Sequence, residues 1–142
     1  MEAWSLIRLY GLMALVFFAI DLVWIGVVAQ SFYQKYLGTL LRPDVVWVAA
    51  LLFYAIYIAG ILVFAVLPAA TAGSLIRAVA LGAFLGFFAY ATFDLTCLAL
   101  FRDFPVTVVV VDLAWGTVLT ASVSAAGYGF ARWLDLIPTG LT

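Results

Sequence analysis

Four long apolar stretches constrain the fold of this chain more than any other feature. They lie near residues 7–30, 45–67, 75–101 and 106–131. Each is long enough to cross the hydrocarbon core of a bilayer, which takes about 20 helical residues. Charged residues make up only 9% of the chain, whereas they make up about a quarter of a soluble domain. The sequence therefore predicts an all-α integral membrane protein, an antiparallel four-transmembrane-helix bundle that forms a single domain over residues 1–142.

Proline and glycine residues mark the predicted ends of these helices. Pro43 and Pro105 come before the second and fourth stretches, where a missing amide N–H costs little because the first turn of a helix leaves its N–H groups unpaired. We expect Pro68 and Gly73 to end the second helix. Residues 31–43 mix apolar and charged side chains, so we expect either a short amphipathic segment in the membrane interface or a partly ordered loop.

The cationic residues leave the orientation open. Three lie on the side of the predicted chain ends and of the turn near Gly73, here called the terminal side: Arg8, Arg77 and Arg132. Three lie on the opposite side, here called the loop side: Lys35, Arg42 and Arg102. The positive-inside rule needs an excess on one side, and here there is none.

Three aspartates interrupt the apolar stretches. Asp21, Asp94 and Asp112 lie on the first, third and fourth predicted helices. An acid in hydrocarbon is costly, so such residues usually face a bundle interior or a wet cavity. At about 1.5 Å per residue, all three should lie roughly 10–14 Å inside the loop-side ends of their helices. We therefore expect the three carboxyl groups to share one site in the bundle interior.

Small residues continue the aspartate faces of two helices. They recur every four positions, as Gly82, Gly86, Tyr90 and Asp94 and as Asp112, Gly116, Thr120 and Ser124. Positions four apart share a helix face, and small residues let helices approach closely in lipid. Both faces should therefore point towards other helices. Packing alone is the alternative explanation for the glycines.

Two tryptophans and two tyrosines complete the predicted site. The run Asp21-Leu22-Val23-Trp24 echoes Asp112-Leu113-Ala114-Trp115. We therefore expect Trp24 and Trp115 to point inwards, where an indole N–H is a donor for a carboxylate on a neighbouring helix. Tyr54 and Tyr90 are the expected hydroxyl partners. By contrast, three tryptophans near predicted helix ends should lie in the membrane interface: Trp4, Trp47 and Trp133.

Missing residue types exclude several kinds of chemistry. The chain has no histidine and a single cysteine, Cys97. This excludes histidine-ligated haem, ordinary catalytic zinc, a Ser-His-Asp relay and a dithiol pair within the chain. No phosphate-binding glycine loop or basic run is present. We expect no cofactor, no dedicated metal site and no nucleic-acid partner. Carboxylate chemistry remains, as proton transfer, binding of a hard cation or hydrogen bonding to a polar head group.

Several motifs resemble a known family. They are residues 19–26 with residues 32–38, residues 88–96 and residues 109–117. These stretches are similar to the bacterial membrane family catalogued as domain of unknown function 2177, over roughly Leu6 to Tyr128. The resemblance implies a small multi-pass protein of the bacterial inner (cytoplasmic) membrane with four helices. It implies no activity, substrate or catalytic residue.

Three functions from different classes fit these observations. The first is binding, or modification, of a lipid or lipophilic small molecule whose polar end meets the aspartates. The second is proton- or cation-coupled transport by a homo-oligomer, since four helices are few for alternating access. The third is a non-catalytic membrane partner subunit. A groove open to lipid favours the first, a water-lined path the second and a dry core the third. The sequence does not decide whether the protein is an enzyme.

Overall fold

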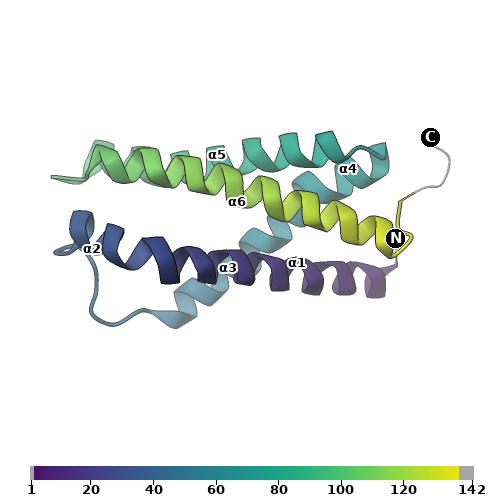
Figure 1. Cartoon of the computed structure of the whole chain (residues 1–142), viewed down its shortest axis with the longest axis horizontal. Coiled ribbons are helices and arrows are strands. Elements are labelled where there is room, and N and C mark those ends of the chain that lie inside the picture. Colours follow the sequence, from purple (N-terminus) through teal and green to yellow (C-terminus); the bar gives the residue numbers. More distant parts are fainter. Residues whose placement is uncertain (1, 138–142) are drawn as a thin grey trace.

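The computed structural model describes residues 2–137, which form a bundle with four spans (Figure 1). The first span contains α1 (Ala3–Trp24), the π-helical turn η1 (Ile25–Ala29) and α2 (Gln30–Leu37). The second contains α3 (Trp47–Ile61), the π-helical turn η2 (Leu62–Val66) and α4 (Leu67–Ala72). The third and fourth are α5 (Leu75–Leu100) and α6 (Val106–Trp133). All four are long and apolar enough to cross a membrane, which confirms the predicted helical membrane bundle.

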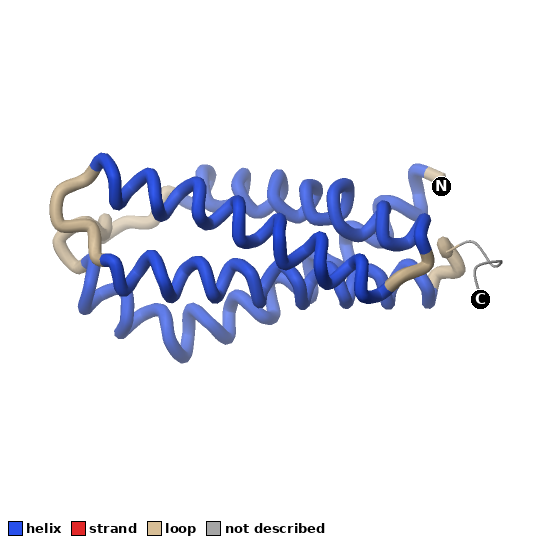
Figure 2. Tube along the Cα trace, turned by 90° about the horizontal axis from the view of Figure 1, so that it is seen from above, coloured by secondary structure: helices blue, strands red, loops and turns tan. Residues whose placement is uncertain are grey.

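Successive spans are antiparallel, and their connections lie at the two ends of the bundle (Figure 2). The turn between α4 and α5 is the tightest. Gly73 there has φ 64°, a left-handed conformation that a residue without Cβ adopts readily. Ser74 then caps α5, because its hydroxyl accepts a hydrogen bond from the Arg77 N–H at 3.2 Å.

Three helix boundaries in the structure differ from the predicted ones. The first helix does not end at Gln30 but continues through η1 to Leu37, so residues 31–37 of the expected amphipathic segment are helical. Pro43 lies in the remaining connection, and α3 begins only at Trp47. Pro68 does not end the second span, because it lies in the first turn of α4 directly after η2. A π turn has already interrupted the regular hydrogen-bond pattern there, so the missing N–H of proline is tolerated.

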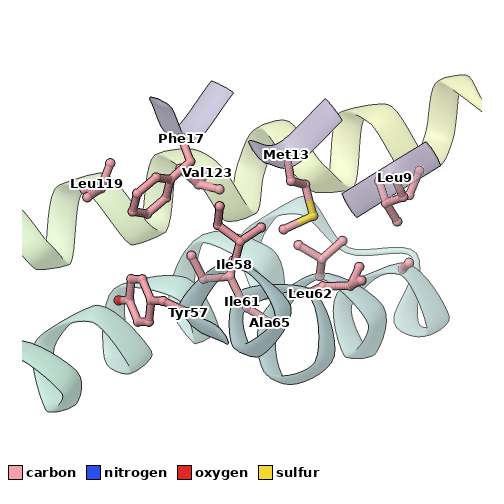
Figure 3. Packing of buried hydrophobic residues seen from close by; sticks show 13 residues of the cluster. Leu9, Met13, Phe17, Tyr57, Ile58, Ile61, Leu62, Ala65, Leu119 and Val123 are labelled. Atoms are coloured by element: carbon pink, nitrogen blue, oxygen red, sulfur yellow. The ribbon is translucent and has the colours of Figure 1, made fainter. Parts of the chain in front are cut away.

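The apolar core fills the terminal-side half and the middle of the bundle (Figure 3). Its buried side chains come from the first, second and fourth spans, and include Leu9, Met13, Phe17, Ile58, Ile61, Leu62, Ala65, Leu119 and Val123. Lipid tails are as apolar as these residues, so close packing rather than a hydrophobic force holds such helices together.

The α5 and α6 helices pack through their small-residue faces. The contacts step along both helices in fours: Gly82 with Ser124, Gly86 with Thr120, and Gly116 with Tyr90. A Cβ on Gly86 would lie 2.7 Å from the Thr120 Cβ, a distance that leaves no room for a side chain. The next step in this register places Asp94 opposite Asp112. The glycine packing therefore determines which two acids meet.

The second span diverges from α5 on the loop side. In Figure 1, α3 runs obliquely away from the α5–α6 pair. The second span packs on α5 mainly through η2 and α4, in the terminal-side half. The loop-side half of the bundle is therefore less tightly closed between α3 and α5.

Candidate functional site

A cavity of about 530 Å³ lies in the loop-side half of the bundle. Thirteen residues line it, from every helix segment except η2 and α4. They include all seven residues singled out from the sequence: Asp21, Asp94, Asp112, Trp24, Trp115, Tyr54 and Tyr90. The structure adds six more, among them Tyr33, Phe53 and Phe93. We call this space the aspartate cavity.

The three aspartates are buried but have different partners. Asp21 is 8% exposed and accepts a hydrogen bond from the Tyr54 hydroxyl at 2.8 Å. Asp112 is 9% exposed and accepts a hydrogen bond from the Tyr33 hydroxyl. Asp94 is fully buried, and neither of its carboxyl oxygens has a partner among the described residues. Two of the acids thus have a phenol partner, and the third has none.

The unpartnered Asp94 lies beside Asp112. Both side chains line the same cavity, and the packing register of α5 on α6 places them opposite each other. As two carboxylates they have only acceptors, so no hydrogen bond forms between them and both oxygens of Asp94 stay unpaired. One proton shared by the pair would turn this repulsive contact into an O–H···O hydrogen bond. The pair is therefore arranged to hold either a proton or a donor from another molecule.

Only one of the expected donors to the acids, Tyr54, forms a hydrogen bond with a carboxyl group in residues 2–137. We also expected Tyr90 or Trp24 to reach a carboxyl group, but the second donor is the phenol of Tyr33. The indoles of Trp24 and Trp115 stack on each other, with ring centroids 4.2 Å apart and planes 8° from parallel. The ring of Tyr90 packs directly on Gly116, where no Cβ would fit. These three aromatic residues therefore shape the cavity wall.

Tyr33 was not predicted as a site residue, because a π turn changes the helix phase before it. In a regular α-helix, at about 100° per residue, Tyr33 would point roughly 120° away from Asp21. The η1 turn takes up one extra residue, which brings Tyr33 to within about 20° of Asp21. Ala29, at the end of η1, is buried and lines the same cavity, as the shifted phase requires. No residue type in η1 is typical of a π turn, so the sequence does not predict this shift.

The aspartate cavity reaches the lipid-facing surface of the bundle. Two of its lining residues, Phe53 on α3 and Phe93 on α5, are 49% and 62% exposed. They belong to the two helices that diverge on the loop side. Both residues lie within helices that are long and apolar enough to span a membrane, and in a transmembrane bundle the side chains exposed on the outside of such helices face lipid. The cavity therefore joins a lipid-facing apolar mouth to an interior with three carboxyl groups.

The described residues do not form a metal centre around these acids. Within residues 2–137, no group of three histidine, cysteine, aspartate or glutamate side chains is arranged to hold a metal ion. The carboxyl and phenol groups of the cavity can exchange protons and form hydrogen bonds.

Comparison with known proteins links the chain to one family. The family described as "Predicted membrane protein (DUF2177)" matches residues 6–129. That match includes every residue that lines the aspartate cavity. No curated protein and no solved structure matches the chain.

Proposed function

We propose that this chain, which belongs to the DUF2177 family of predicted membrane proteins, binds a lipid or another lipophilic molecule in the aspartate cavity. The polar end of the molecule lies at the carboxyl groups, and its apolar part leaves between α3 and α5. One observation carries this proposal: the same cavity has exposed aromatic residues at its mouth and buried acids inside. An apolar pocket with a few convergent polar groups is the usual form of a small-molecule site.

The route into the cavity supports a ligand that arrives from the bilayer. Phe53 and Phe93 line the cavity, are exposed, and lie within two of the membrane-spanning helices, so the proposed ligand enters from the bilayer. Membrane lipids are therefore the proposed source of ligand. The motif resemblance supports the bacterial cytoplasmic membrane as the location, and a helical bundle fits that membrane better than the outer membrane, whose spanning proteins are β-barrels.

Lipid retention tests the proposal. The purified protein in mild detergent should keep a lipophilic molecule that native mass spectrometry detects as a discrete added mass. Asp94→Asn should weaken retention, because asparagine keeps the shape of the side chain and loses its charge. Asp103→Asn is the matched control: Asp103 lies outside the cavity with φ 58°, and asparagine adopts that left-handed conformation readily. The same loss in both variants, or no discrete adduct, would contradict the proposal.

The two alternative functions give different results in the same preparation. A proton- or cation-coupled transporter would acidify or alkalinise proteoliposomes when an ion gradient is applied, and Asp94→Asn would abolish this flux. It would also be expected to purify as a homo-oligomer. A partner subunit would show neither flux nor a bound lipophilic molecule, and Asp94→Asn would weaken assembly alone.

A further inference from the structure

We infer that the ligand of the aspartate cavity carries a positively charged ammonium head. This inference rests on the proposed function and deepens it, because it names the chemical class of the polar end. Three independent observations support a cation: the charges that line the cavity, the aromatic residues in its wall and the unpartnered carboxyl group of Asp94.

The charges of the cavity select against an anionic head group. Three carboxyl groups line it, and its thirteen lining residues include neither lysine nor arginine. The cations nearest in sequence to the loop-side ends, Lys35 and Arg102, are exposed and are not part of the lining. A phosphate or carboxylate head would therefore meet only charges of its own sign. An ammonium group would meet three acceptors of opposite charge.

The aromatic wall is suited to the same kind of head. Seven of the thirteen lining residues are aromatic, from five segments of the chain: Trp24, Tyr33, Phe53, Tyr54, Tyr90, Phe93 and Trp115. An ammonium group is attracted to the negative face of an aromatic ring, most strongly for tryptophan and where water is excluded. Carboxylates surrounded by aromatic rings therefore bind a cation better than a neutral hydroxyl.

The carboxyl group of Asp94 lacks hydrogen-bond donors that a ligand could provide. Both of its oxygens are buried without a partner, and a buried acceptor left unpaired is costly. An alkylammonium head has three N–H donors, enough to bond Asp94 and Asp112 together. Charge then balances as an exchange: the ammonium enters and the proton shared by the two acids leaves to the loop side. The carboxyl O–H bond breaks as its proton passes to water on the loop side, and no other covalent bond forms or breaks in the protein or the ligand.

Entry to Asp94 requires side chains around it to move. The oxygens of Asp94 are covered in this structure, and the neighbouring Asp112 is occupied by the Tyr33 hydroxyl. Tyr33 is only half-buried and lies on the short helix α2. Its phenol therefore holds the place on Asp112 that the ammonium head takes when it binds.

Three probes with the same tail test the inference: dodecylamine, dodecanol and monododecyl phosphate. Binding to the protein in nanodiscs of neutral lipid is measured by titration, after subtraction of the uptake by protein-free nanodiscs. We expect dodecylamine, as its ammonium ion, to bind roughly tenfold more tightly than dodecanol, as expected for a desolvated cation among aromatic rings. Monododecyl phosphate should bind most weakly. Asp94→Asn should remove the preference for the amine and keep dodecanol binding, whereas Asp103→Asn should change neither.

The outcomes separate this inference from the proposed function. If no probe binds saturably, the proposed function fails as well. If dodecanol or the phosphate binds as tightly as the amine, only the ammonium head is wrong. A preference for the amine that survives in Asp94→Asn also overturns the inference. If Asp94→Asn does not elute as a single species on size exclusion, Asp112→Asn takes its place in the same comparison, with the same expected loss.

Discussion

The phenol of Tyr33 on α2 donates a hydrogen bond to the carboxylate of Asp112 on α6, 79 positions further along the chain. This bond fastens the loop-side end of the first span to the fourth. It also lies at the wall of the aspartate cavity, so the contact that closes the bundle there is at the same time a contact of the site. Substitution of Tyr33 should therefore change both the free energy of unfolding and the affinity of the cavity for its ligand.

Tyr33→Phe should destabilise the protein by about 1–3 kcal/mol, since it leaves a buried acceptor on Asp112 without its donor. Unfolding in mixed micelles by a denaturing detergent measures this difference. Hydrogen exchange should become faster in α2 and stay unchanged in the terminal-side core. Tyr36→Phe is the control, because Tyr36 lies on the same helix and outside the cavity. Equal effects of the two substitutions would show that the bond to Asp112 adds nothing to stability.

Gly116→Ala should destabilise the bundle by about 1–3 kcal/mol, the usual cost of overpacking. A Cβ at this position would overlap the ring of Tyr90, so α5 and α6 must separate. Gly129→Ala on the same helix has nothing within 4 Å of the new Cβ, and alanine is the better helix former by about 1 kcal/mol. Thermal unfolding followed by size exclusion should therefore show a lower midpoint for the first variant only. A loss in both would mean that α6 needs glycine for another reason.

Binding of a permanently charged cation should strengthen as the pH rises. Dodecyltrimethylammonium has no proton to lose, so its pH dependence reports the cavity alone. The ionisable side chains that line the cavity are three carboxyls and three phenols, namely Asp21, Asp94, Asp112, Tyr33, Tyr54 and Tyr90. Cation and proton compete for the Asp94–Asp112 pair. The dissociation constant should fall by about tenfold per pH unit wherever the free pair holds one proton more than the complex.

This pH dependence is measured by equilibrium titration across the neutral range. It should flatten in Asp94→Asn, which cannot hold the shared proton, and persist in Asp103→Asn. An affinity that does not change with pH would show that the free pair carries no exchangeable proton, and would contradict the prediction.

Cysteine labelling should place the two ends of the first span on opposite membrane faces. The chain has one cysteine, Cys97, which is buried, so Cys97→Ala gives a clean background. Ala3→Cys lies at the start of α1 and Thr39→Cys lies beyond the end of α2. A membrane-impermeant maleimide should label the first from one face of sealed vesicles and the second only from the other. Labelling of both positions from one face would rule out the spanning arrangement of α1 to α2.

The sequence was most informative where the helices are regular. The four spans follow from hydropathy and length. Small residues every four positions predicted that α5 and α6 each face another helix, and in the structure these two faces pack on each other, which places Asp94 opposite Asp112. The failures lie next to π turns. Tyr33 reaches the cavity only because η1 shifts the helix phase, and Pro68 continues a span only because η2 precedes it. An extra residue in one helical turn has no compositional signature, so neither result was predictable from residue types.

The two sides of the aspartate cavity differ in how freely they can adjust. On one side, α5 and α6 touch backbone to backbone at Gly86 and Gly116, and such a contact has no side-chain rotamers that can absorb a change of shape. On the other, α3 diverges from α5 and α2 is held to α6 by a phenol. The α5–α6 hairpin therefore forms a rigid wall of the aspartate cavity. Any accommodation of differently shaped molecules falls to the first two spans, so selection by charge should be stricter in this protein than selection by tail length.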